Sequence, residues 1–281
     1  TRQEGACKES FREEGHDVTM GARTSQSLVR AREEAAGFGA RHDLATHLFA
    51  AAMGLSGSSA LRNALADSSA DSKSLQALAS AAFASLSTDA KKLVGELVAL
   101  PWSKAEDLQA ALEELGIRVL TRAAGDSADV IGELLAISTL VHSDPEVELA
   151  IGSKRASSSA KADLVSALVG GKVSAEAEAI TRHLVSDSRG RRIGRMLMSA
   201  AEIVADEMGK GLAVVTVAKP LTASQREHIL SLVQDKYARP HYVAQQVDPG
   251  LVGGARIRVG HDVIDGSVAT RLQDLRIKLA G

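Results

Sequence analysis

The residues whose spacing most suggests catalysis are His261, Asp262 and Asp265, near the end of the 281-residue chain. A histidine beside two carboxylates could transfer protons as a general acid and base. The same segment is rich in glycine, however, and aspartate and glycine are the residues that tight turns favour. We therefore expect a hairpin turn here, and a small hydrolase that uses His261 and Asp265 is the weaker hypothesis.

Phosphate binding would need a glycine-rich loop or a cluster of cations. Gly171-Lys172 lacks the earlier glycine and the following hydroxyl residue of a phosphate-binding loop. One basic cluster is present, formed by Arg189, Arg191, Arg192 and Arg195. It could contact RNA, but the net charge is −2 and aromatic residues make up only 2% of the chain, so stacking platforms for single strands are missing. We expect these arginines at a solvated helix start or against an acidic partner.

Metal and cofactor sites are not expected. The eight histidines are scattered, and Cys7 is the single cysteine, which can form neither an internal disulfide nor a cysteine zinc cluster. The sequence contains no dinucleotide fingerprint, zinc helix motif or nucleophile elbow. We therefore predict no catalytic residue, no metal and no cofactor.

The elements that would position these residues are mostly helical. From Leu28 to Gly209, apolar residues recur at helical spacing, and alanine, the best helix former, is abundant. Ser103-Lys-Ala-Glu106 has the form of a capping box, and Asp144-Pro145 that of a cap followed by proline in the first turn. Residues 1–19 are polar and lack apolar periodicity, which predicts a disordered tail.

The helical region also contains a weak internal repeat of about 86 residues. The segment that starts at Asp43 aligns with the one that starts at Asp129, so that Leu48 meets Leu134. Chance alignment of two alanine-rich stretches is the alternative explanation. The repeat predicts two helical bundles in tandem, over residues 20–124 and 125–210, with residues 106–124 closing the first and opening the second.

The pattern changes after Gly209. Residues 212–218 form a continuous β-branched run typical of a buried strand, and Thr222-Ala-Ser-Gln225 caps a helix that extends to about Tyr237. Residues 241–247 and the alternating segment 255–259 predict two further strands, followed by a short strand and a closing helix. The expected fold class is thus mostly α, with tandem helical bundles followed by a small α/β domain over residues 211–281.

Residues 247–281, VDPGLVGGARIRVGHDVIDGSVATRLQDLRIKLAG, resemble the C-terminal signature of the ATP synthase delta subunit family, which includes the oligomycin-sensitivity-conferring protein. The turn residues that carry the resemblance are Asp248, Pro249, Gly253, Gly254, Gly260, Asp265, Gly266 and Ser267. The order strand, capped helix, strand over 212–247 is also similar, and the helix pattern over 129–209 extends the likeness. Ordinary members have one bundle, and the extra length here resembles the enlarged delta subunits of actinobacteria.

The resemblance implies a non-catalytic stator connector of an F-type ATP synthase, which couples rotation to ATP synthesis. In the family, the helical bundle binds N-terminal helices of the alpha subunits, and the C-terminal domain binds the peripheral-stalk b subunit. The complex places such a subunit at the cytoplasmic face of the plasma membrane, with no nucleic acid and only indirect membrane contact. We expect alpha contacts from four residues of the second bundle, although a plain core role suits them equally: Leu134, Ile137, Leu184 and Val185. The alternative hypothesis is a helical RNA-binding factor of the antitermination type.

Overall fold

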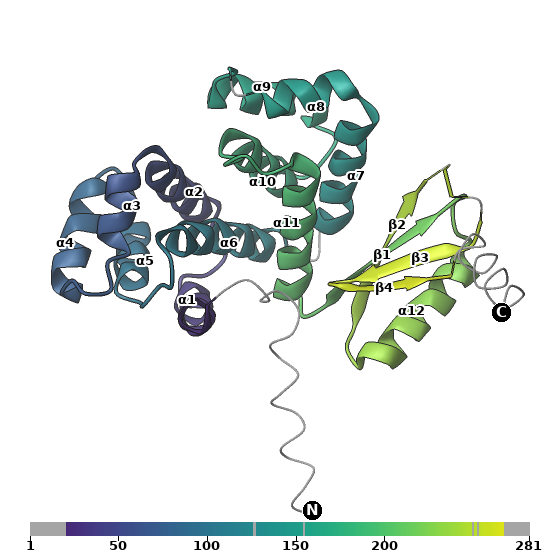
Figure 1. The fold of residues 1–281 in the computed structure, drawn as a ribbon, viewed down its shortest axis with the longest axis horizontal. Coiled ribbons are helices and arrows are strands. Elements are labelled where there is room, and N and C mark those ends of the chain that lie inside the picture. Colours follow the sequence, from purple (N-terminus) through teal and green to yellow (C-terminus); the bar gives the residue numbers. More distant parts are fainter. Residues whose placement is uncertain (1–20, 126–127, 154, 249, 252, 267–281) are drawn as a thin grey trace, which may run out of the picture. The chain divides into compact units, whose positions relative to one another are not determined.

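The structure is a computed structural model that describes residues 21–125, 128–153, 155–248, 250–251 and 253–266. It divides into a helical unit that ends at Glu207 and an α/β unit that begins at Met208 (Figure 1). The prediction of a mostly helical chain with a small α/β region at its C-terminal end is confirmed. The predicted tail over residues 1–19, Pro249, Ser267 and the predicted closing helix lie outside the described residues.

The described part of the helical unit contains eleven helices. They are α1 (Ala22–Ala36), α2 (His42–Gly57), α3 (Ser59–Leu65), α4 (Ser72–Ala82), α5 (Thr88–Val98), α6 (Ala105–Ala124), α7 (Val130–Ser143), α8 (Pro145–Gly152), α9 (Ser158–Val169), α10 (Ala175–Ser186) and α11 (Ile193–Glu207). None of these helices is long and apolar enough to cross a membrane alone; α2 and α3 together have the length and composition, but they are bent by 114°.

Side-chain caps decide where most of these helices begin. In seven of them, a serine or aspartate accepts a hydrogen bond from a backbone amide of the first turn, which would otherwise lack a partner. These caps are Ser58, Asp71, Ser87, Asp129, Asp144, Ser157 and Ser174. Asp144 followed by proline at the first helical position is confirmed.

The predicted start of α6 was wrong by one residue. The cap is Lys104, whose amide donates to the Asp107 carboxylate at 3.0 Å, and not Ser103. The Ser103 hydroxyl instead accepts a hydrogen bond from the Thr24 amide at 3.3 Å. A contact with α1 therefore replaces the local capping bond.

The helices after α6 repeat the arrangement of those before it. All five buried positions of α7 have buried counterparts 86 residues earlier in α2, from Leu44 with Val130 to Leu55 with Val141. All five buried positions of α5 have buried counterparts 87 residues later in α10. Two caps, Ser58 and Asp71, also have counterparts 86 residues later. The structure thus follows the period that the sequence predicts.

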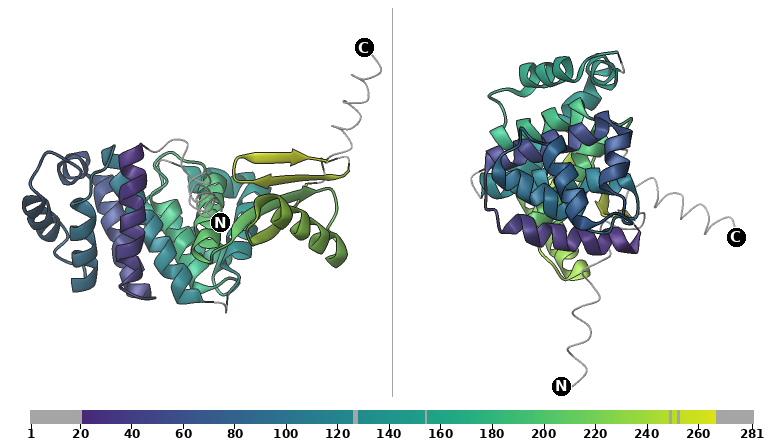
Figure 2. Two further views of the ribbon diagram at one scale, coloured as in Figure 1. Left: turned by 90° about the horizontal axis from the view of Figure 1, so that it is seen from below. Right: turned by 90° about the vertical axis from the view of Figure 1, so that its left-hand side faces the viewer.

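Helix α6 contacts helices on both sides of it in the sequence. It packs against α1, α2, α3 and α5 and also against α10 and α11 (Figures 1 and 2). As a result, 14 of its 20 residues are buried. The boundary at residue 124 between two bundles stays a prediction, and the helix that ends there packs with both.

The α/β unit contains β1 (Gly211–Val217), α12 (Ala223–Tyr237), β2 (His241–Val247), β3 (Ala255–Val259) and β4 (Asp262–Asp265). The sheet order is β2-β1-β3-β4; β1 and β2 are parallel, and the other two pairs are antiparallel. Helix α12 packs on one face of the sheet (Figure 2).

Several predictions about this unit are confirmed. Thr222 and Gln225 form the expected capping box of α12. Alternate residues of β3 pack against the core of the unit, as the alternating sequence indicates. Not every apolar residue of α12 is buried: Ile229 and Val233 face the core, whereas Leu232 is 51% exposed. One helical residue advances the side-chain direction by about 100°, so Leu232 points away although Val233 is buried.

Candidate partner-binding sites

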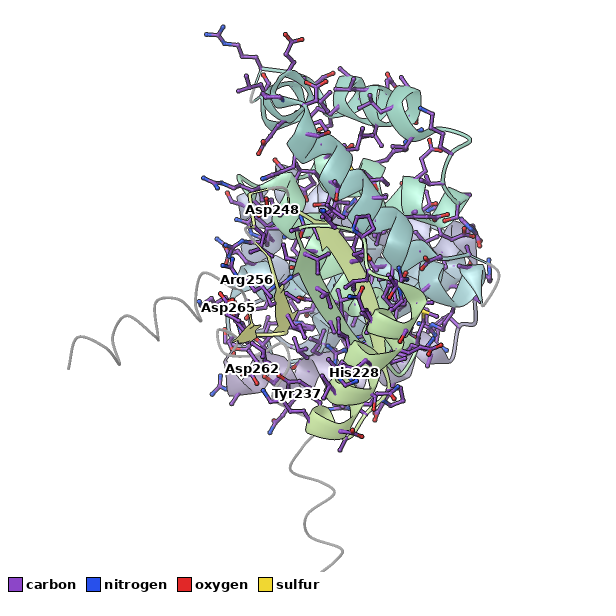
Figure 3. All side chains as sticks on the ribbon, turned by 90° about the vertical axis from the view of Figure 1, so that its right-hand side faces the viewer. His228, Tyr237, Asp248, Arg256, Asp262 and Asp265 are labelled. Atoms are coloured by element: carbon purple, nitrogen blue, oxygen red, sulfur yellow. The ribbon has the colours of Figure 1, made fainter. Side chains whose placement is uncertain are left out.

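Asp248 closes the turn after β2. Its side-chain oxygen Oδ1 accepts a hydrogen bond from the Gly250 amide at 2.8 Å, and its carbonyl oxygen accepts one from the Leu251 amide at 3.1 Å. Its own amide donates to the Val217 carbonyl of β1 at 2.9 Å. The predicted turn, which begins at Asp248 (Figure 3), therefore also ties the ends of two neighbouring strands together.

Glycines of the signature occupy backbone positions that other residues rarely adopt. The φ angle is +82° at Gly254, before β3, and +56° at Gly260, in the turn between β3 and β4. Gly266 differs, because its requirement is space: its amide donates to the Ala255 carbonyl at 2.9 Å, and a Cβ would lie 3.3 Å from that oxygen. These turns hold the hairpin of β3 and β4 on the sheet.

The residues considered for acid–base catalysis lie in that hairpin. His261 is exposed in its turn. Asp262 accepts a hydrogen bond from the Tyr237 hydroxyl at 2.9 Å, whereas Asp265 pairs with Arg256 at 3.3 Å (Figure 3). Because the two carboxylates bind different partners on different elements, the geometry favours the hairpin interpretation over a shared catalytic site.

The four predicted alpha contacts lie in the core of the helical unit. Leu134, Ile137, Leu184 and Val185 are all at most 3% exposed. Their counterparts in the repeat are equally part of the core, namely Leu48, Ala51, Leu97 and Val98. In this structure they hold helices together, and any contact with a partner stays a prediction.

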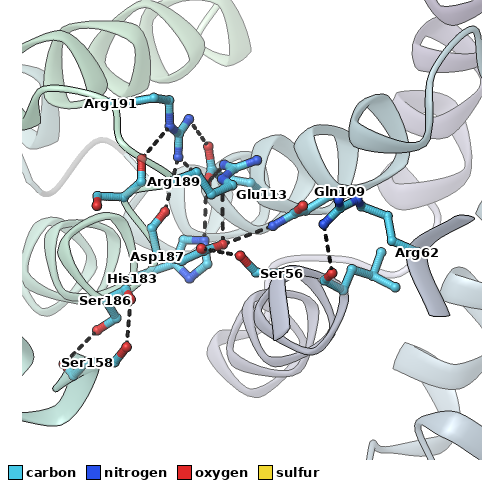
Figure 4. A network of polar contacts seen from close by, with 12 residues as sticks. Ser56, Arg62, Gln109, Glu113, Ser158, His183, Ser186, Asp187, Arg189 and Arg191 are labelled. Atoms are coloured by element: carbon cyan, nitrogen blue, oxygen red, sulfur yellow. Dashed lines mark hydrogen bonds and ion pairs between the residues drawn. The ribbon is translucent and has the colours of Figure 1, made fainter. Parts of the chain in front are cut away.

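Two members of the arginine cluster bind an acid within the chain. Arg191 holds the buried Glu113 carboxylate of α6 with both terminal nitrogens, at 2.7 and 2.9 Å, and Arg189 donates a further hydrogen bond to it (Figure 4). In such a bidentate ion pair, two N–H groups of the planar guanidinium bond to the two oxygens of the carboxylate. The expected acidic partner of these arginines is thus a side chain of the same protein.

Glu113 is held in its ionised form. Burial alone would raise the pKa of this carboxyl, but contact with the His183 ring and the hydrogen bonds and positive charges of Arg191 and Arg189 outweigh burial. The net effect holds the pKa of Glu113 well below its ordinary value. The Nε2 atom of His183 lies 3.4 Å from Glu113, and neither ring nitrogen has a well-aligned hydrogen-bond partner in the described part of the chain.

The same network reaches α2. Asp187, between α10 and α11, accepts hydrogen bonds from Gln109 of α6 at 3.0 Å and from Ser56 of α2 at 2.6 Å (Figure 4). Phe49 of α2 stacks on His183 with ring centroids 4.1 Å apart. Three helices and one loop are therefore joined by a single polar cluster around the buried side chains of Glu113 and Asp187.

A second charged cluster is centred on Arg118 of α6. Its guanidinium contacts Glu114 at 2.7 Å, Asp206 at 2.7 Å and Glu207 at 2.9 Å. Burial would lower the pKa of Arg118, but the three carboxylates raise that pKa by more than burial lowers it, so the side chain stays charged. Glu114 also binds Arg32 of α1 at 2.8 Å. This cluster joins α1, α6 and the end of α11.

Sequence patterns singled out Arg189 and Arg191 but not their buried partner Glu113, and they gave no sign of the cluster around Arg118. Glu114 and Arg118 stand four residues apart, a spacing that indicates an ion pair on a helix surface, which is the usual place for such pairs. Nothing local indicates that this surface is covered. Among the described residues, no group of three or more histidine, cysteine, aspartate or glutamate side chains could hold a metal ion.

Comparisons with known proteins agree with the resemblance seen in the sequence. A family model described as ATP synthase delta (OSCP) subunit matches residues 117–279. A protein named ATP synthase subunit delta from Leifsonia xyli is 42% identical and is covered in full by an alignment with 93% of this chain. Another of that name from Streptomyces avermitilis is 35% identical over 78% of this chain and 82% of the relative. A chain of the solved mitochondrial ATP synthase hexamer of Toxoplasma gondii aligns with 60% of this chain and 98% of its own length, at 24% identity and a TM-score of 0.35.

Proposed function

The chain belongs to the ATP synthase delta (OSCP) subunit family, and from this premise we propose that it is a non-catalytic stator connector. As a member of this family it is a subunit of ATP synthase, a membrane-associated complex. We further propose that its helical unit binds the N-terminal helices of alpha subunits and that its α/β unit binds the end of the b subunit. The subunit would then lie at the cytoplasmic face of the plasma membrane, held there by the complex.

The observation that carries the proposal is the length of the match to the Leifsonia xyli relative. It extends over 264 residues and covers that relative completely, so the extra helices before α6 are shared by a relative named ATP synthase subunit delta. The family model itself begins inside α6 and continues through the α/β unit. The enlarged helical unit therefore accompanies the family-like part and is no peculiarity of this chain.

The geometry suits a mechanical part. A connector that resists torque needs slow dissociation, which broad contacts provide better than a small polar site. The polar clusters of the helical unit are used to hold helices together, as Glu113 and Arg118 show. The contacts of Arg189 and Arg191 with Glu113 also engage half of the cluster that suggested RNA binding. Neither the structure nor the comparisons favour that alternative.

The test is selective loss of one partner in the full-length chain. Valine in place of Gly266 would press against the Ala255 carbonyl and displace the end of β4. We expect the Gly266→Val variant to lose binding to a b-subunit peptide in calorimetry while it still binds catalytic heads. Gly57→Val is the matched control, because a Cβ at Gly57 meets nothing within 4 Å. The fluorescence of Trp102, the only tryptophan, reports that the helical unit remains folded.

Either of two results would contradict the proposal. One is a Gly266→Val variant that binds the stalk peptide as tightly as the control does. The other is purification of the tagged chain from native membranes without catalytic-head or stalk subunits. Turnover of any substrate by the purified chain would overturn the non-catalytic role separately.

A further inference from the structure

The helices of the helical unit make the same contacts twice. Helix α2 packs on α6 as α7 packs on α11, α4 packs on α5 as α9 packs on α10, and α3 bridges α2 and α4 as α8 bridges α7 and α9. Every main helix contact among α1–α6 has a counterpart among α6–α11. In this correspondence, α6 is the last helix of the first set and the first helix of the second.

Individual side chains follow the same rule. Arg32 of α1 reaches a carboxylate on α6, and Arg118 of α6, 86 residues later, reaches carboxylates on α11. Ser27 of α1 binds the Pro101 carbonyl in the loop before α6, and its counterpart Glu113 binds arginines in the loop before α11. Two alanine-rich stretches can align by chance in sequence, but such a chance alignment would not produce these equivalent contacts.

We propose that the helical unit consists of two overlapping six-helix copies, α1–α6 and α6–α11, that share α6 and therefore unfold as one body. Neither copy can release α6 without opening the other, because this helix supplies buried side chains to both. The inference concerns folding alone and goes beyond the proposed function, since it holds whichever partners the protein binds.

Contacts outside α6 add to this coupling. Phe49 of α2, in the first copy, stacks on His183 of α10, in the second. Ser56, also of α2, donates to Asp187 at 2.6 Å, and His42 at the start of α2 lies 2.7 Å from Glu176 of α10. One helix of the first copy thus contacts the second copy at its beginning, middle and end.

The outer face of α1 shows where the series stops. Five positions that are buried on α6 are exposed and polar on α1: Arg23, Gln26, Arg30, Glu33 and Glu34 take the places of Gln109, Leu112, Gly116, Val119 and Leu120. Terminal units of stacked repeats carry such a polar outer face because no further unit covers them. Helix α1 is therefore the end helix, and α6 is the internal one.

The test uses matched core deletions in the full-length chain. Leu93 of α5 and Ile180 of α10 are counterparts 87 residues apart, and both are fully buried. Unfolding by urea is followed by Trp102 fluorescence, which reports the first copy, and by amide hydrogen exchange of α2 and of α7. If the copies share one transition, Leu93→Ala lowers the midpoints of all three probes by the same amount. Ile180→Ala likewise lowers all three by one common amount.

The opposite outcome is also specific. If Ile180→Ala lowers the midpoint of α7 and leaves α2 and Trp102 at the wild-type midpoint, the copies unfold separately and the proposal is wrong. If a deletion variant does not accumulate in folded form, Ile180→Val removes one methyl group and tests the same equality with a smaller shift. A wild-type chain that unfolds in two steps would equally overturn it.

Discussion

Adding one methyl group at Gly116 tests how tightly α2 and α6 approach each other. A Cβ there would lie 2.4 Å from Cε1 and 2.6 Å from Cδ1 of Phe49, both far below van der Waals distance. The Phe49 ring is only 7% exposed and stacks on His183, so it has little room to move. Gly116→Ala therefore forces a shift in the place where α2, α6 and α10 meet.

Two opposing effects set the size of the change. Alanine is favoured over glycine inside a helix by about 1 kcal/mol. Overpacking of a filled core costs about 1–3 kcal/mol. The net expectation for Gly116→Ala is a loss of about 1 kcal/mol, or about 2–4 °C in Tm for a chain of this size. Gly95→Ala in α5 is the control, because its Cβ would lie 3.8 Å from Gln76 and it should raise stability by up to about 1 kcal/mol.

The assay is urea unfolding of the full-length variants, followed by far-UV circular dichroism. The reasoning predicts opposite signs for the two glycine substitutions, although both improve helix propensity. Phe49→Leu in the Gly116→Ala background should recover part of the loss because the smaller side chain clears the added methyl group. A Gly116→Ala protein as stable as Gly95→Ala would refute the close packing of α2 on α6.

Three further outcomes are expected. Glu113→Gln should destabilise the protein by about 2–3 kcal/mol at neutral pH, because it removes the carboxylate that Arg189 and Arg191 share. This loss is smaller than for a fully buried ion pair, since both arginines are partly exposed. The pKa of Glu113 is lowered in the folded protein, so the stabilisation by its carboxylate is complete above the ordinary pKa of 4.5. The difference in urea midpoint between wild type and Glu113→Gln should therefore shrink as the pH falls below 4.5. Glu96→Gln should raise Tm at pH 7 by about a degree or less and leave Tm unchanged at pH 3. Burial, and after it the nearby charge of Glu34, raises the pKa of Glu96 and disfavours its ionised form in the folded protein. A lower Tm at pH 7 would contradict this reasoning. Thr222→Ala should cost about 1 kcal/mol through loss of the α12 cap, seen as faster amide exchange in that helix alone; unchanged exchange would show that the cap is dispensable.

Local signals in the sequence predicted the elements whose contacts are local. The caps at Asp144 and Thr222 depend on residues two or three positions away, and the strand at residues 255–259 depends on its own alternation. The predicted start of α6 was wrong because Ser103 binds Thr24, which lies 79 residues earlier in the chain. No local pattern can report such a contact.

The shared helix was the hardest part to predict. Periodicity assumes that a helix has one buried face and one solvated face, so Glu113 and Arg118 read as surface residues. Their burial follows from the packing of a second set of helices on the other side of α6. For the same reason, the four leucine, isoleucine and valine candidates for partner contact are core residues here: apolar periodicity marks what is buried, not which neighbour buries it.

The charged outer face of α1 limits how a protein of this type can grow longer. Because neighbouring copies overlap by one helix, a third copy placed before α1 would add five helices instead of six. It would also require small or apolar residues in place of Arg23 and Arg30, which now keep that side of α1 in water. An engineered spacer of adjustable length could be made in this way, in steps of about 86 residues, by copying the face of α6 onto α1.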